Sequence, residues 1–239
     1  MTPPGIASIL APTGTLRAAL NLGNPVLVQR GADGAPRGTT VDLARELGRR
    51  LGVPVAFLEY DGAGKVADAA GSGVWDVAFM AIDPVRAADI EFTAPYVVIE
   101  GTYVVPEASP LQTVEAVDHP GIRVAVGQAS AYHLFLARTL RHAALVTAPT
   151  GEASAELFLH GGAEVLAGVR QPNDALVRAA PGLRAIPGRF MSIQQAMGVP
   201  HGRGAGAGYL RAFVEDVKAF GFVARALAGS GQDSGLVAP

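Results

Sequence analysis

The sequence predicts an α/β protein with two lobes, in which mixed sheets are flanked by helices. Three observations favour this class. Short apolar runs alternate with stretches of helical spacing, as in sheets with parallel strands. The alternation forms two series, which are separated near Pro106 and Pro110. Two extended segments, residues 97–105 and 191–198, connect the series and form a predicted two-strand hinge.

The first series contains short apolar runs that are typical of buried strands. The predicted strands are Leu16–Leu20, Val53–Leu58 and Val77–Met80. Thr39-Thr40-Val41-Asp42 has the pattern of a capping box, so a helix is expected from there to Leu51, before Gly52. A second helix is expected over about Lys65–Ala70, and a short helical turn over Pro84–Ala88.

The second series repeats the same alternation after Pro110. Its predicted strands are Val124–Val126, Leu145–Thr147 and Glu164–Ala167, and its predicted helices are Tyr132–Leu140, Ala153–Leu159 and one after Pro172. A last helix is expected after residue 199, with one apolar face that consists of Leu210, Phe213, Val217 and Phe220. The tail from Gly229 is expected to fray. Lobe 1 is therefore expected to comprise residues 1–100 and 198–239, and lobe 2 residues 106–191.

Composition narrows the function classes. Apolar residues make up 49% of the chain and charged residues 17%, which predicts a substantial core. Because there is no cysteine, disulfides and thiolate chemistry are excluded. The net charge of −2 gives no broad basic face for nucleic acid. The five histidines are scattered without the spacing of metal ligands, so we expect no metal site. We also expect no cofactor, and we expect the protein to be a monomer.

The start of the chain does not have the pattern of a secretory signal. Residues 1–15 have neither a basic segment nor a long apolar one. No apolar run in the chain is long enough to span a bilayer. Three interpretations stay open: a cytoplasmic protein, a native start further upstream, or a removed signal that Met1 has replaced.

Three segments resemble a known family. Trp75–Arg86, followed by Ile90–Tyr96, resembles a strand, a ligand-binding turn, an Arg and a "D-F-S-x-P-Y" run. Gly121–Tyr132 is similar to a "G-K-x-V-A-V-x-x-G-T/S" turn, and Gln194–Pro200 to a returning hinge strand. In this order they resemble the amino-acid-binding proteins of ABC transporters, bacterial extracellular solute-binding protein family 3. The resemblance covers about Thr15–Leu227.

This resemblance implies a two-lobed, periplasmic-binding-protein-like II fold. It also implies a non-enzymatic, solute-binding component of an ABC-type uptake system, which closes on a small solute in a cleft between its lobes. The implied location is the periplasm, and the implied partner is an ABC permease, through which alone the protein would meet a membrane.

The resemblance also implies which residues bind the solute. Arg86 stands where the family binds the ligand's carboxylate, and a guanidinium suits a carboxylate because its planar fork gives two hydrogen bonds. The alternative is a surface Arg that caps the short helix or pairs with Asp89. Gln128 to Tyr132 opens a helix, whose N–H groups suit an anion. In this segment, Ser130 and Ala131 are candidate contacts of the solute, although Ser130 is equally suited to capping the helix.

Two departures from the family pattern concern the ligand's ammonium group. In the family, an Asp pairs with the α-ammonium group. This chain has Arg170 at that position, or Val169 if the alignment gap is placed differently. At the end of the first strand, where many relatives have an acidic residue, this chain has Asn21. Both changes remove negative charge. We therefore expect a small anionic, carboxylate-bearing solute and not an ordinary α-amino acid, with Arg170 and Lys65 as further cations.

The remaining candidate contacts are polar or belong to the backbone. Met80 and Ala81 follow the third predicted strand and offer only backbone atoms, because Ala81 has no hydroxyl. Glu100 is expected either to accept a donor from the solute or to form a salt bridge with a nearby cation. Asn24 and Gln171 are expected to supply hydrogen bonds.

Two rival functions remain open on the same fold. One is an enzyme similar to cyclohexadienyl dehydratase, in which Glu100 would act as general acid while Arg86 holds the substrate's carboxylate. Turnover of prephenate or arogenate would identify it. The other is a signalling, effector-binding domain that works without a transporter.

Overall fold

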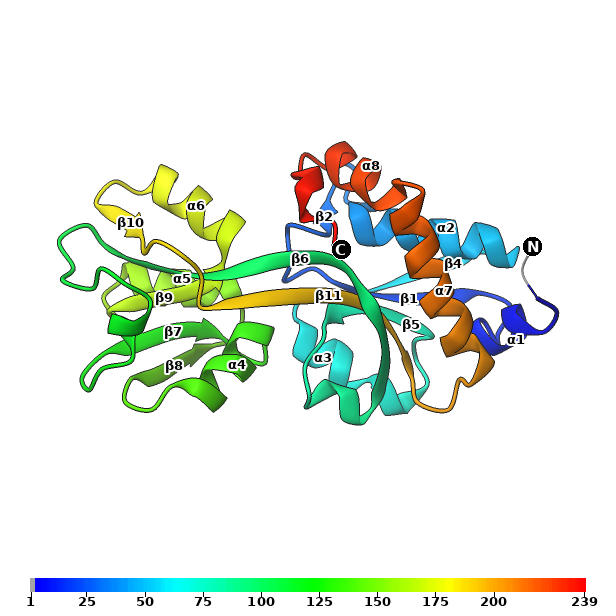
Figure 1. Cartoon of the computed structure of the whole chain (residues 1–239), viewed down its shortest axis with the longest axis horizontal. Helices are drawn as coiled ribbons and strands as arrows, with labels where there is room; N and C mark the ends of the chain where they lie inside the picture. Colours follow the sequence, from blue (N-terminus) through cyan, green and yellow to red (C-terminus); the bar gives the residue numbers. More distant parts are fainter. Residues whose placement is uncertain (1–2) are drawn as a thin grey trace. The chain divides into compact units, whose positions relative to one another are not determined.

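The computed structural model describes residues 3–239 and divides them into two compact units (Figure 1). Unit 1 comprises the chain up to Val98 together with Gln194–Pro239, and unit 2 comprises Ile99–Ile193. The chain passes between the units twice, within strands β6 (Ile90–Pro106) and β11 (Met191–Pro200). The predicted α/β class with mixed sheets is confirmed.

Unit 1 is built on strands β4 (Val55–Tyr60), β1 (Leu16–Asn21), β5 (Val77–Ala81) and β11, in that order. β1 is parallel to both β4 and β5, while β11 runs antiparallel to β5. The other elements before unit 2 are α1 (Ile6–Leu10), β2 (Gln29–Arg30), β3 (Pro36–Arg37), α2 (Thr39–Leu51), α3 (Ala63–Asp68), η1 (Ala70–Ser72) and η2 (Arg86–Ala88). After β11 follow α7 (Ala205–Ala219), α8 (Phe222–Gly229) and η4 (Ser234–Leu236).

Unit 2 is built on strands β6, β9 (Val165–Val169), β7 (Arg123–Gly127) and β8 (Ala144–Ala148), in that order. β7 is parallel to β8 and β9, whereas β6 is antiparallel to β9. A short strand, β10 (Leu183–Ala185), pairs with β6. The remaining elements are η3 (Glu115–Val117), α4 (Ala131–Thr139), α5 (Gly151–Leu159) and α6 (Arg170–Ala179).

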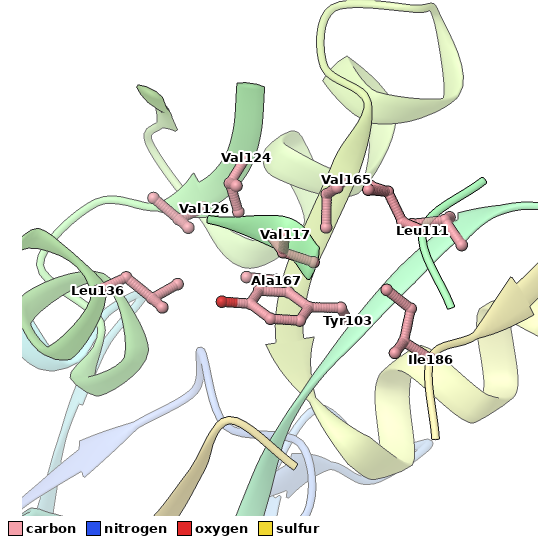
Figure 2. Close-up of a cluster of buried hydrophobic side chains, with 10 residues drawn as sticks. Tyr103, Leu111, Val117, Val124, Val126, Leu136, Val165, Ala167 and Ile186 are labelled. Carbon is pink, nitrogen blue, oxygen red and sulfur yellow. The ribbon is translucent and has the colours of Figure 1, made fainter. Parts of the chain in front are cut away.

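The helices of unit 2 cover both faces of its sheet, as the strand period of two requires. Val124 and Val126 of β7 point to the face that carries Leu136 of α4, and Figure 2 shows the Tyr103 ring at the centre of this cluster. Ala125 points to the opposite face, where Phe158 of α5 packs. Both faces are therefore buried, which explains why the strands appear in the sequence as continuous apolar runs.

The start of α2 corrects one prediction. The expected capping box is absent, because Gly38 is the N-cap residue and makes no side-chain cap. The Thr40 hydroxyl and the Thr40 N–H both donate to the Leu27 carbonyl, at 3.2 Å. The Thr39 hydroxyl is buried without a partner among residues 3–239. A tertiary contact with the preceding loop thus replaces the local cap.

The end of the chain corrects two more predictions. Phe220 was expected on the buried face of the last helix, but α7 ends at Ala219 and Phe220 is 71% exposed. Gly221, at φ 66°, ends this helix and α8 begins. The tail is packed and not frayed, since Val237 bridges to Val97 and Ala238 donates to the Tyr96 carbonyl at 3.1 Å.

Candidate functional site

The carboxyl ends of parallel neighbouring strands meet at one edge of a sheet, and this edge collects candidate residues in each unit. In unit 1, β1 ends at Asn21 and β5 ends at Ala81, directly after Met80. In unit 2, β7 leads into Ser130 at the start of α4, and the adjacent β9 leads into Arg170 at the start of α6. The alternation of strands and helices thus places several of the predicted residues of each unit at the carboxyl-end edge of its sheet.

Arg86 lies in the turn after β5 and is only 4% exposed. Asp83 shapes this turn, because its carboxylate accepts the Val85 N–H at 2.9 Å and its carbonyl accepts the Ala87 N–H. The Arg86 Nη1 donates to the Ala81 carbonyl at 2.9 Å. Burial lowers the pKa of Arg86 to about 10, although the negative charge of Asp83 opposes that shift. Arg86 is therefore a buried cation, still charged at neutral pH, at the end of β5.

The N-terminus of α4 is a closely hydrogen-bonded turn. Ser130 is the N-cap residue, and its Oγ accepts the His133 N–H at 3.0 Å. The His133 Nδ1 in turn accepts the Ala129 N–H at 3.0 Å. Tyr132 is hydrogen-bonded to the Ser130 side chain and the Gly127 backbone, while burial raises its pKa. Gln128 is exposed, and its N–H pairs with the Ala148 carbonyl. The predicted cap at Ser130 is present in the structure.

Glu100 binds two arginines of unit 2. Its Oε2 accepts from the Arg170 Nε at 2.5 Å, and its Oε1 accepts from the Arg189 Nη1 at 2.8 Å. Arg170 also donates to the Gly188 carbonyl at 2.8 Å. Of the two roles predicted for Glu100, the structure shows the salt bridge with Arg170. Burial raises the pKa of Glu100, but the two guanidinium groups outweigh burial and leave that pKa below its usual value.

Replacing Glu100 with Gln is expected to cost only about 1 kcal/mol of unfolding free energy, because the side chains of Glu100 and both arginines stay partly exposed to solvent. Urea unfolding of the purified variant measures this. A loss above about 3 kcal/mol would mean instead that the three charges act as a buried network.

The other predicted residues differ in whether their side chains have a partner within the described part of the protein. Lys65 pairs with Asp61 at 2.7 Å, and both side chains are more than half exposed. The Asn21 Oδ1 accepts the Gly23 N–H at 3.1 Å. In contrast, the amide oxygens of Asn24 and Gln171 are buried without a partner among residues 3–239. Because a buried acceptor without a donor costs free energy, these two oxygens are suited to accept hydrogen bonds from a ligand or from water.

Three residues that contribute to these sites were not predicted. The Asp83 carboxylate accepts the N–H of the residue two positions later, Val85, which is the pattern of an Asx turn. An Asp at the start of a turn is visible in the sequence. His133 follows Ser130 by three residues, the spacing of a capping box. Arg189 gives no such signal, because its partner Glu100 is far away in the sequence.

Two other kinds of functional feature concern the described part of the chain, a metal site and a membrane-spanning helix. Residues 3–239 contain no group of three or more His, Asp or Glu side chains that would hold a metal ion. None of their helices is long and apolar enough to cross a membrane. A pocket of about 410 Å³ lies between α2 and α8, and no candidate residue lines it. Its lining residues are Asp42, Arg45, Glu46, Arg49, Phe222, Arg225 and Ala226.

The two mixed-sheet units, with polar residues at the carboxyl ends of their strands, have an α/β architecture that suits the binding of a small molecule. The sequence model of the bacterial extracellular solute-binding proteins, family 3, matches residues 16–223. The chain belongs to this family. No curated protein matches the sequence.

Solved structures agree with this fold. A mutant of ArgBP from T. maritima has a TM-score of 0.80 and 20% identity, over 95% of this chain and 99% of that one. An amino acid ABC transporter substrate-binding protein from Streptococcus pneumoniae, bound to L-arginine, has a TM-score of 0.79 and 15% identity, over 98% and 99%. The ancestral amino-acid-binding protein AncCDT-1, a precursor of cyclohexadienyl dehydratase, has a TM-score of 0.79 and 19% identity, over 93% and 97%.

Proposed function

We propose that this protein binds a small carboxylate-bearing solute for an ABC-type uptake system, outside the cytoplasmic membrane, and that Arg86 binds the carboxylate. One observation carries the second part of the proposal. Arg86 is a buried, charged guanidinium that donates to the Ala81 carbonyl, at the carboxyl end of β5 in the unit 1 sheet. A fixed cation that is shielded from water gives a carboxylate more binding free energy than an exposed one.

The second group of proposed contacts belongs to unit 2. It consists of backbone N–H groups and the Ser130 side chain at the N-terminus of α4. The helix begins after the buried strand β7, with Ser130 as its cap. The N–H groups of a first helical turn and the helix dipole both favour a negative group. Ser130, Ala131 and Tyr132 are the residues that we assign to this contact.

The chemistry around the strand ends supports a solute other than an ordinary α-amino acid. The family pairs the ligand's α-ammonium group with a carboxylate. At the positions where the family resemblance implies acids, this chain carries Asn21 and either Arg170 or, with another gap, Val169. Glu100 is bound by Arg170 and Arg189. The amide oxygens of Asn24 and Gln171 offer neutral acceptors. We therefore propose a solute that combines a carboxylate with neutral hydrogen-bond donors.

Catalysis of the dehydratase type is not part of this proposal. A general acid must hold a proton at working pH, whereas the two arginines lower the pKa of Glu100 and keep its carboxylate ionised. The binding role needs no proton transfer. Incubation with prephenate or arogenate is expected to leave both compounds unchanged.

Native mass spectrometry of freshly purified protein tests the proposal, because a bound solute adds its own mass to the chain. We expect a solute that carries a carboxylate and is lost after unfolding and refolding. Calorimetry with L-arginine, L-lysine, L-glutamate and succinate then compares the charge classes. A dissociation constant near micromolar needs only about −8 kcal/mol, which a few charge-assisted hydrogen bonds supply. A bound solute without any acidic group, or an ordinary α-amino acid, would contradict the proposal.

A further inference from the structure

The first turn of α4 is closed by a histidine in a position where capping boxes usually have Glu or Gln. The Ser130 Oγ accepts the His133 N–H, and the His133 Nδ1 accepts the Ala129 N–H, each at 3.0 Å. In the usual capping box, a Glu or Gln side chain accepts the N–H of the N-cap residue itself. Here the ring accepts the N–H of Ala129, the residue before the cap, while the Ser130 N–H donates to the Gly127 carbonyl. A ring nitrogen accepts a hydrogen bond only without a proton of its own, so His133 is neutral here and carries its proton on Nε2.

The backbone next to this bond is strained. Ala129 has φ 53°, and among residues 3–239 it is the one non-glycine residue with a positive φ. This left-handed conformation costs an ordinary L-residue on the order of 1–2 kcal/mol, so contacts around it must hold it in place. The bond from the Ala129 N–H to His133 is one such contact, and it belongs to the turn that presents Ser130.

We propose that neutral His133 is the positioning residue of the α4 N-terminus, and that its protonation releases Ala129 and so weakens the binding of a carboxylate there in acid. The release itself depends only on the hydrogen bonds of the turn. Its consequence for solute binding rests on the function proposed above.

The charged residues of β7 and of the rest of α4 stand away from the first turn of α4. β7 packs against α4, and its one charged residue, Arg123, stands at the other end of the strand, where it pairs with Glu164 at 2.7 Å. Within α4, Arg138 lies in the last turn, and Tyr132 is tied to Ser130 and Gly127. Burial lowers the pKa of His133. The unfolded chain therefore takes up this proton more readily than the folded one, and stability falls as pH drops below about 6.5.

Urea unfolding at pH 7.5 and pH 5.5 tests the release without any solute. His133→Gln supplies an amide oxygen, one bond further along the side chain, as a replacement acceptor, and it does not titrate. His160→Gln is the matched control, because it replaces an exposed histidine whose Nδ1 faces the Glu156 carbonyl at 2.8 Å. Between the two pH values, we expect the unfolding equilibrium constant of wild type and of His160→Gln to rise by several-fold more than that of His133→Gln, up to about tenfold for one proton and one pH unit. Equal pH dependence in all three proteins would overturn the proposal.

NMR of the wild-type protein gives a second reading that does not depend on a variant. The ¹⁵N shift of the His133 Nδ1 and the amide signal of Ala129 should titrate with one shared midpoint below about 6.5. In His133→Gln, the Ala129 amide signal should not move over that range. An Ala129 amide that stays constant in wild type while the His133 ring titrates would show that protonation releases nothing.

Calorimetry with L-arginine, L-lysine, L-glutamate and succinate at both pH values tests the consequence for binding. A solute that binds is expected to bind several-fold more weakly at pH 5.5 to wild type, and with little change to His133→Gln. Equal binding at both pH values would refute this consequence. If none of the four binds at either pH, the same comparison is made with the solute that native mass spectrometry identifies, while unfolding and NMR still decide the role of His133.

Discussion

Replacing Asp76 with Asn is expected to lower the free energy of unfolding by about 3–5 kcal/mol, which is the cost of breaking a buried ion pair. The Asp76 side chain is completely buried. Its Oδ1 accepts from the Arg17 Nη2 at 2.8 Å and from the Arg203 Nη2 at 3.1 Å. Its Oδ2 accepts the N–H and the Nε of Arg17, both at 3.0 Å. An amide in the same place would direct one NH₂ group at these donors and leave two guanidinium groups without their shared anion.

Three segments of unit 1 depend on this carboxylate. Arg17 belongs to β1, and Arg203 precedes α7 and also donates to the Ile9 carbonyl in α1 at 2.5 Å. Loss of the charge is therefore expected to loosen the packing of α1 and α7 together with the sheet.

Asp61→Asn is the matched control, because it removes a carboxylate of the same kind from an exposed pair with Lys65. That variant should lose about 1 kcal/mol or less. Urea unfolding of both variants, with the slope compared to wild type, measures the difference. If Asp76→Asn loses no more than Asp61→Asn, the buried cluster contributes no net stability.

Replacing Arg86 with Ala is expected to weaken solute binding by about 2–5 kcal/mol, because the carboxylate would lose a buried partner. Calorimetry with a solute that binds the wild type measures this. The same change also deprives Asp83 of a neighbouring cation, so the unfolding free energy must be measured in parallel. Arg86→Lys keeps the charge but gives up the two-pronged fork, and it should bind more weakly than wild type while remaining folded.

Arg211→Ala is the control for this experiment. Arg211 also lies in unit 1 and pairs with Glu91 at 2.6 Å, but half of its side chain is exposed. Solute binding by Arg211→Ala should equal that of wild type. Less than tenfold weakening in both Arg86 variants, with the fold intact, would show that Arg86 does not bind the carboxylate.

The sequence determined the α/β class, the order of most strands and helices, and the family. These features depend on local pattern: runs such as Val77–Met80 are apolar because both faces of the strand are covered, and Gly52 ends α2 through a left-handed turn. The same patterns placed Ser130 as a helix cap. Neighbours along the chain fix such properties, so the sequence is enough to predict them.

Only the tertiary structure decided which polar groups pair with each other. Glu100 forms salt bridges with Arg170 and Arg189. The Leu27 carbonyl accepts a backbone N–H at the start of α2, and the Ala238 N–H donates to the Tyr96 carbonyl although the tail is rich in Gly and Ser. Each of these contacts joins residues that are distant in sequence. No local pattern encodes their distance or burial, because both arise only when the strands and helices pack. The same packing buries Arg86 and gives it the environment on which its proposed role depends.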